Sequence, residues 1–355
     1  MQHLRTDELI LHLSLNRITF LSYKEKRILS KKLDSSYSLA LLSIEEICKI
    51  INRSINNRVK WDGKENLRMA ELSAHYCDVL GVKIILSSDE DYPYLLKQIS
   101  DPPYLLFCRG DHEILNRKTV SVVGTRRLTP AGKAAAHSFA YDASLNGMNV
   151  VSGLAAGADG AAHQGCLDAF FDCQERGIDT AATGKTVAVL PSSIDEVVPY
   201  AHKRMASQVL KCGGCLLSEY EPGMSMASWH FVARNRIIAG LSQATVVIEA
   251  PPGSGALITA DFALDYNREV FFHKAAFGDA AQKLAHNVHC QLEKDHATGQ
   301  VSRYKLENRP ERYLDAGAPV VSSFADFVLQ ASGQKPQNSG QKASGCVQNF
   351  QGELF

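Results

Sequence analysis

The first 80 residues carry apolar side chains at helical spacing, with polar and basic residues filling the other faces. Examples of these apolar positions are Leu9, Leu13, Ile28 and Leu29. The segment LSIEEICKII opens like a capped helix at Ser43. The pattern therefore predicts a small all-helical module over residues 1–80.

From residue 118 the pattern changes to short apolar runs that alternate with helical stripes. Strands are predicted at 119–124, 148–152, 185–190, 215–218, 244–250 and 269–272. After GTRRLTP the helical stripe consists of Ala136, Phe139, Ala140 and Ala143, at the spacing of a sheet-facing helix. This alternation predicts an α/β fold, a doubly wound and mostly parallel Rossmann-like sheet, in a domain that spans residues 81–330.

Three segments depart from this alternation. Residues 80–111 contain prolines and short apolar runs, which predict a connector with one or two strands. Residues 275–312 are polar and predict a partly helical insertion. Residues 331–355 are rich in Gln, Ser, Gly, Lys and Asn, and we expect a disordered tail because such a composition buries little apolar surface.

Composition narrows the class of protein only in part. The 355 residues include 38 basic and 38 acidic side chains, so the formal net charge of 0 neither supports nor excludes a nucleic-acid partner. No apolar run approaches the roughly 18 residues of a membrane span, and we expect a cytoplasmic protein with no membrane partner. Nine cysteines in mostly apolar surroundings are typical of reduced, buried thiols. For Cys212 and Cys215 we favour a turn into a buried strand over a redox or zinc role, since no second C-x-x-C follows.

Glycines, small hydroxyl residues and arginines follow the predicted strands. In a doubly wound sheet these positions lie at the carboxyl ends of the strands, where helix N-termini favour an anionic ligand. His163 and Asp159 could form an acid–base or metal pair, but we favour a hydrogen bond from His163 that fixes the loop. No catalytic triad, zinc-protease, Walker A or paired-carboxylate pattern is present. The prediction is a binding protein without catalytic residues, metal or cofactor.

Seven motifs in order resemble the DNA-processing protein A family, also called DprA or Smf. They are YPYLLKQISDPPYLLFCRGD, VVGTRRLTPAG, VVSGLAAGADGAAHQGCLDA, GKTVAVL, LLSEYEPG, FVARNRIIAGLS and VVIEAPPGSGALITADFAL. The resemblance covers roughly residues 80–273. It implies a non-enzymatic homodimer that binds incoming single-stranded DNA, protects it and loads RecA during natural transformation. The helical N-terminal module would be SAM-like or helix-hairpin-helix-like.

The resemblance also implies a set of DNA contacts in the loops. They are Gly124, Thr125, Arg126, Ser152, Gly153, Gly157, Lys203, Arg234, Asn235, Ser254 and Gly255. Arg234 is expected to share a basic groove with Gly124 and Arg126, whereas Arg236 is expected to pair with an acidic neighbour. Ala156 stands where the family usually has Arg or Lys.

Two alternative functions and one further partner remain at this stage. The first is a nucleotide-binding sensor or nucleoside monophosphate hydrolase of a related Rossmann-like fold, although Thr259 replaces the glutamate of the hydrolase signature. The second is an interaction adaptor that has lost DNA binding. A further possible partner is the DNA polymerase sliding clamp, because the C-terminal QGELF, Gln351–Phe355, resembles a clamp-docking peptide.

Overall fold

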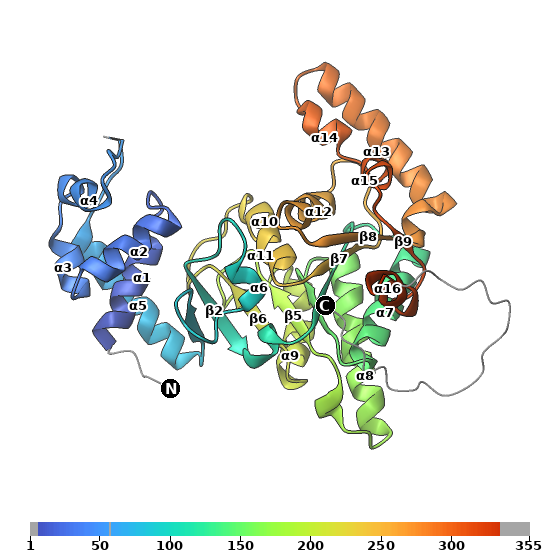
Figure 1. Cartoon of the computed structure of the whole chain (residues 1–355), viewed down its shortest axis with the longest axis horizontal. Coiled ribbons are helices and arrows are strands. Elements are labelled where there is room, and N and C mark those ends of the chain that lie inside the picture. The colour runs from blue at the N-terminus through green and yellow to red at the C-terminus, as the bar shows by residue number, and fades with distance from the viewer. Residues whose placement is uncertain (1–5, 57, 334–355) are drawn as a thin grey trace.

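The computed structural model describes residues 6–56 and 58–333 of the chain. Its N-terminal part is a group of helices that lies at one end of the molecule (Figure 1). These helices are α1 (Thr6–Arg17), α2 (Tyr23–Lys32), α3 (Ser36–Leu41), α4 (Ile44–Ile51) and α5 (Gly63–Val79). We call residues 6–79 the helical module.

Local capping sets the start of these helices. The Ser43 hydroxyl accepts a hydrogen bond from the Glu46 N–H at 3.2 Å, and the Glu46 carboxylate accepts one from the Ser43 N–H at 2.8 Å. This reciprocal pair satisfies two backbone donors that have no partner within the helix. Leu29 is fully buried, whereas Ile28 is 38 % exposed. The prediction that Ile28 lies on the apolar face is therefore wrong, because the face of α2 that packs on the core carries Leu29 and not Ile28.

A nine-stranded sheet forms the body of the protein, in the order β1-β2-β6-β5-β4-β3-β7-β8-β9. The strands are β1 (Lys83–Leu86), β2 (Leu105–Gly110), β3 (Thr119–Val123), β4 (Asn149–Ser152), β5 (Thr186–Val189), β6 (Cys215–Ser218), β7 (Ala244–Val247), β8 (Glu269–His273) and β9 (Val320–Val321). In this order the strands from β6 to β9 pair in parallel, whereas β1–β2 and β2–β6 pair antiparallel. The predicted doubly wound, mostly parallel fold is confirmed.

Helices cover both faces of this sheet. One face is covered by α7 (Pro130–Leu145), α8 (Ala158–Glu175) and α9 (Lys203–Lys211). The other face is covered by α6 (Tyr94–Lys97), α11 (Asn235–Gly240) and α12 (Gly255–Asp265). Val122 packs in the first layer and Val123 in the second, as the alternation of a strand requires. The predicted stripe from Ala136 to Ala143 is buried against the sheet.

The segment after β8 is mostly helical. It contains α13 (Asp279–Ala297), α14 (Arg303–Glu307), α15 (Pro310–Asp315) and α16 (Phe324–Ala331). In Figure 1, α13 projects from the body, while α16 returns to cover the edge of the sheet. Phe327 of α16 packs on Phe139 and Phe271, with ring centroids 5.6 and 5.0 Å apart. The predicted docking peptide Gln351–Phe355 lies outside the described residues. Within the described residues, no helix has the length and apolar character needed to cross a membrane.

Candidate functional site

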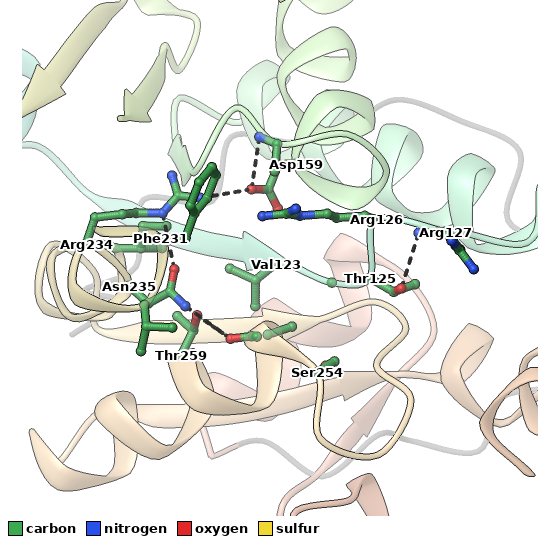
Figure 2. Close-up of a pocket in the computed structure, with 16 residues that line it drawn as sticks. Val123, Thr125, Arg126, Arg127, Asp159, Phe231, Arg234, Asn235, Ser254 and Thr259 are labelled. Carbon is green, nitrogen blue, oxygen red and sulfur yellow. Dashed lines mark hydrogen bonds and ion pairs between the residues drawn. The ribbon is translucent and has the colours of Figure 1, made fainter. Parts of the chain in front are cut away.

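A pocket of about 380 Å³ opens where the order of strands in the sheet reverses. The chain runs from β3 to β4 and β5 on one side, and from β7 to β8 and β9 on the other. The loops after β3 and β7 therefore diverge and leave a crevice at the carboxyl ends of these strands. The short helix α10 (His230–Ala233) and the start of α11 close one side of it (Figure 2).

The pocket brings together seven of the eleven predicted contact residues. They are Gly124, Thr125, Arg126, Arg234, Asn235, Ser254 and Gly255. The other four, Ser152, Gly153, Gly157 and Lys203, do not line it.

Backbone contacts define the loop after β3. The Thr125 N–H donates to the Glu249 carbonyl at 2.7 Å, and the Thr125 hydroxyl accepts from the Arg127 N–H at 3.2 Å. A Cβ atom at Gly124 would stand 2.7 Å from the Ala158 Cβ. Glycine is therefore required at 124 by the close approach of α8, and the loop that follows is held in a defined shape.

The two arginines of this loop are exposed. The Arg126 guanidinium lies over the Phe231 ring, 4.9 Å from its centroid. Figure 2 shows Arg126 extending across the pocket toward Asp159, while Arg127 points away. In the described part of the chain, neither guanidinium forms a salt bridge. Both therefore keep their donors available for an anionic ligand.

Arg234 occupies a different environment from Arg126. Its side chain is buried, and Nη1 donates to the carbonyl oxygens of Gly153 (2.6 Å) and Val189. Nη2 lies 3.9 Å from the Asp159 carboxylate. Burial lowers the pKa of Arg234 to about 10, and Asp159 opposes this shift, so the group stays charged at neutral pH. The guanidinium thus joins β4, β5 and α8 at the wall of the pocket, and its predicted role as a DNA contact stays a prediction.

Asn235 and Arg236 follow Arg234 and also serve the protein's own structure. The Asn235 side chain donates to the Gly255 carbonyl at 3.2 Å and accepts from Arg234 Nε at 3.2 Å. It therefore links the starts of α11 and α12. Arg236 pairs with Glu219 at 2.6 Å and Asp101 at 3.2 Å, as expected for a structural arginine.

The predicted residues after β4 support the pocket from behind. The Ser152 hydroxyl is buried and donates to the Val122 carbonyl at 2.6 Å. A Cβ atom on Gly153 would stand 2.2 Å from the Arg234 guanidinium. Gly157 has φ +82°, and a Cβ atom there would stand 2.3 Å from the Thr125 carbonyl. These three residues permit close packing of the loops and are not pocket contacts.

Lys203 begins α9 on the next strand-to-helix connection. It is exposed, and its ammonium lies 4.4 Å from the centroid of the exposed Tyr200 ring. The neighbouring His202 side chain bonds to the Leu154 carbonyl at 2.8 Å, which ties this segment to the loop after β4. Lys203 therefore lies on a neighbouring part of the surface, outside the pocket.

Ser254 and Gly255 form the opposite wall at the N-terminus of α12. The Ser254 hydroxyl is buried and has no hydrogen-bond partner among the residues that the structure describes. Gly255 has no atom closer than 4.0 Å to the place of a Cβ. The N-terminus of α12 at this wall is suited to an oxygen-rich, anionic ligand.

Asp159 and His163 stabilise the loop after β4. The buried Asp159 carboxylate accepts from the backbone N–H groups of Gly153 (3.1 Å) and Ala155 (3.3 Å), and burial raises its pKa against the effect of Arg234. His163 Nε2 accepts from the Leu154 N–H at 3.2 Å, and Nδ1 bonds to the Thr186 hydroxyl at 2.6 Å. Burial lowers the pKa of His163 to about 3, so the ring is neutral. The favoured role for His163, a loop-fixing hydrogen bond, agrees with this geometry.

Sequence reasoning assigned no role to two residues that line the pocket, Phe231 and Val232. Phe231 supports Arg126, and no local pattern could indicate this contact, because the two residues lie far apart in the sequence. Cys212 and Cys215 are buried, and no cluster of metal-ligating side chains occurs among the described residues.

The model of the family of DNA recombination-mediator protein A matches residues 83–299. This span is more than half of the chain and includes all residues of the pocket. The chain belongs to this family. The resemblance inferred from the seven motifs is confirmed.

Individual members of the family show the same relationship. Protein Smf of Synechocystis is 39 % identical over 193 residues, which are 53 % of this chain and 45 % of that protein. The DNA processing protein DprA of Bacillus subtilis is 36 % identical over 192 residues, 54 % of this chain and 60 % of that protein. The matches therefore span about half the length of these relatives. The X-ray structure of DprA from Streptococcus pneumoniae superposes with a TM-score of 0.62 at 26 % identity, and covers 92 % of this chain and 98 % of that one.

Proposed function

We propose that this protein binds single-stranded DNA, with the phosphate backbone held at the pocket between the loops after β3 and β7. The observation that carries the proposal is the Arg126 guanidinium, which is exposed, lies over Phe231 in the pocket and makes no salt bridge among the described residues. Phosphate oxygens accept hydrogen bonds from a guanidinium and from the backbone N–H groups at a helix N-terminus, such as that of α12 on the opposite wall. The family's name and its DNA-processing relatives support the same ligand.

The experiment is a salt-titrated binding measurement on labelled single- and double-stranded oligonucleotides. Arg126→Ala should weaken single-strand binding about tenfold with little dependence on base sequence, because a charged hydrogen bond to phosphate is lost. The slope of log affinity against log salt should shrink by about 0.7. Arg176→Ala is the matched control, since Arg176 is exposed at the far end of α8, roughly 27 Å from the pocket edge by helix length. Equal slopes and affinities for the two variants would contradict the proposal.

Protection of the bound strand and loading of RecA are the finer parts of this proposal. They follow from the family resemblance, as do self-association into a homodimer and the absence of catalysis. RecA filament assembly on single strands, measured with and without this protein, tests the loading role. Release of free base from nucleoside monophosphates tests the hydrolase alternative, for which Thr259 stands in the glutamate's place.

A further inference from the structure

Apolar side chains are exposed next to the pocket, on α10 and the segment that leads to it from β6. They are Met224 (38 % exposed), Met226 (37 %), Trp229 (61 %) and Val232 (44 %). Single exposed apolar residues are common on protein surfaces, but four within nine residues, including a tryptophan, indicate a contact surface.

Trp229 adjoins the mouth of the pocket through helical geometry. Its backbone is helical (φ −70°, ψ −19°), and its carbonyl accepts from the Val232 N–H at 3.1 Å. Residues three apart in a helical turn have neighbouring side chains. Val232 lines the pocket, and Phe231 beside it carries the Arg126 guanidinium. The Trp229 indole therefore lies next to the part of the pocket that holds the Arg126 guanidinium.

Packing against neighbouring rings holds the Trp229 indole in place before any ligand binds. Its ring meets the His230 ring edge to face, with centroids 4.2 Å apart. His230 in turn stacks on Tyr220 at 3.9 Å and 11°, and both rings are buried. Burial lowers the pKa of His230, which favours the neutral form of the ring in this stack. One side of Trp229 thus rests on a buried aromatic pair, while 61 % of the side chain remains open to solvent.

We infer that Trp229 is a base-stacking platform, on which an unpaired base of the bound strand lies while Arg126 holds the adjoining phosphate. The inference rests on the proposed function. It gives Trp229 the role of selecting single-stranded over double-stranded DNA. An exposed indole beside a free guanidinium matches a ligand that presents a flat apolar face next to an anion, which is the repeating unit of a single strand. Bases within a duplex stack on each other and offer no free face.

The test compares oligothymidylate with an abasic oligonucleotide of equal length and charge. Trp229→Ala should weaken oligothymidylate binding about fivefold to tenfold and leave abasic binding and the salt slope unchanged. Trp229→Phe should retain most of the affinity, because a flat ring remains. Thermal unfolding of each variant verifies that it is folded.

Fluorescence gives an independent readout. The chain has two tryptophans, and Trp61 lies in the helical module, where its indole N–H donates to the Leu42 carbonyl at 2.8 Å. In a Trp61→Phe protein the signal comes from Trp229, and oligothymidylate should quench it while the abasic strand does not.

The outcomes separate this inference from the proposed function. The first outcome concerns the ratio of the affinity for oligothymidylate to the affinity for the abasic strand. If this ratio is the same in wild type and in Trp229→Ala, the stacking role alone is overturned. Quenching that depends on protein concentration without DNA would assign the surface to self-association and also overturn it. Failure of the wild type to bind either strand would overturn the DNA-binding proposal, and this inference with it.

Discussion

Gly157 controls how closely two loops of the pocket approach. Its φ of +82° and ψ of −123° are open to glycine but costly for other residues, and a Cβ would collide with the backbone of the neighbouring loop at Thr125 and Arg126. The loop that presents Arg126 therefore depends on a residue that does not line the pocket.

Gly157→Ala should lower the free energy of unfolding by about 3 kcal/mol and weaken single-strand binding, because the loop after β3 must shift. Gly177→Ala is a matched control. Gly177 also has a positive φ, +66°, but no atom of the described residues lies within 4 Å of a Cβ there, so we expect a loss of only about 1 kcal/mol and unchanged binding. Urea denaturation and oligonucleotide titration measure both effects. Equal losses in the two variants would show that the collision has no consequence.

His163 makes stability depend on pH. Its ring accepts from the Leu154 N–H, so a proton on Nε2 would place two donors against each other. The folded-state pKa of about 3 lies below the ordinary value of 6.5, so between these values the unfolded chain binds a proton that the folded chain does not. The stabilisation is complete above pH 6.5 and declines as the pH falls toward 3. At pH 5.5 the loss should be on the order of 1 kcal/mol.

Urea denaturation of wild type and His163→Gln at pH 7.5 and 5.5 measures this contribution. The variant should lose less stability on acidification than the wild type does. Proton titration of His163 by NMR gives a second test that does not require the variant to fold. A protonated ring at pH 5.5 in the native protein would contradict the prediction.

At the scale of elements, Glu249 joins the end of β7 to the start of α7. Its buried carboxylate accepts from the Thr129 N–H at 3.0 Å and from the Thr129 hydroxyl at 2.5 Å, and Thr129 in turn caps the helix by accepting from the Gly132 N–H. A Cβ atom on Gly132 would stand 2.3 Å from this carboxylate. Glu249, at the end of the sheet strand β7, thus holds the N-cap residue of α7. This N-cap lies immediately after the loop that carries Arg126 and Arg127.

Glu249→Ala should cost about 2–4 kcal/mol of stability, since it leaves the Thr129 N–H and hydroxyl without their acceptor and opens a cavity. Weaker DNA binding should accompany this loss. Glu46→Ala is the matched control, because Glu46 also completes a helix cap but is exposed, and we expect a clearly smaller loss. Chemical denaturation ranks the two variants, and a larger loss for Glu46→Ala would contradict the prediction.

At the scale of the whole molecule, an ion pair connects the helical module to the segment that carries Trp229. Arg17 at the end of α1 pairs with Glu221, and their side chains are 22 % and 9 % exposed. Burial lowers the pKa of Arg17. A second link is the bond between His12 and the Tyr104 hydroxyl at 2.6 Å. The helical module therefore restrains the segment beside the pocket through α1.

Arg17→Ala should lower the free energy of unfolding by about 2–4 kcal/mol, because it leaves the Glu221 carboxylate buried without its partner. Hydrogen exchange around Glu221 and Trp229 should become faster. The control is Arg68→Ala, which removes an exposed arginine paired with the exposed Glu65 and should have little effect. Unchanged exchange in Arg17→Ala would show that the module does not restrain this segment.

The sequence alone determined the class of fold and the edge of the sheet where the site lies. Strand and helix periods are local properties, so β3 to β8 each begin within one residue of the prediction. Glycines and arginines at strand ends were sufficient to indicate an anionic ligand. The antiparallel addition of β1 and β2 was not predictable, because pairing partners depend on contacts between distant segments.

Only the tertiary structure decided which side chains can face a ligand. Arg126 and Arg234 look alike in the sequence, yet one guanidinium is exposed and the other donates to buried carbonyls. Likewise, an aromatic position such as Trp229 gives no sign in the sequence that its ring stays exposed. The physical reason is that burial and hydrogen-bond partners are set by whichever segments pack against a residue, and residues far apart in the chain supply those segments.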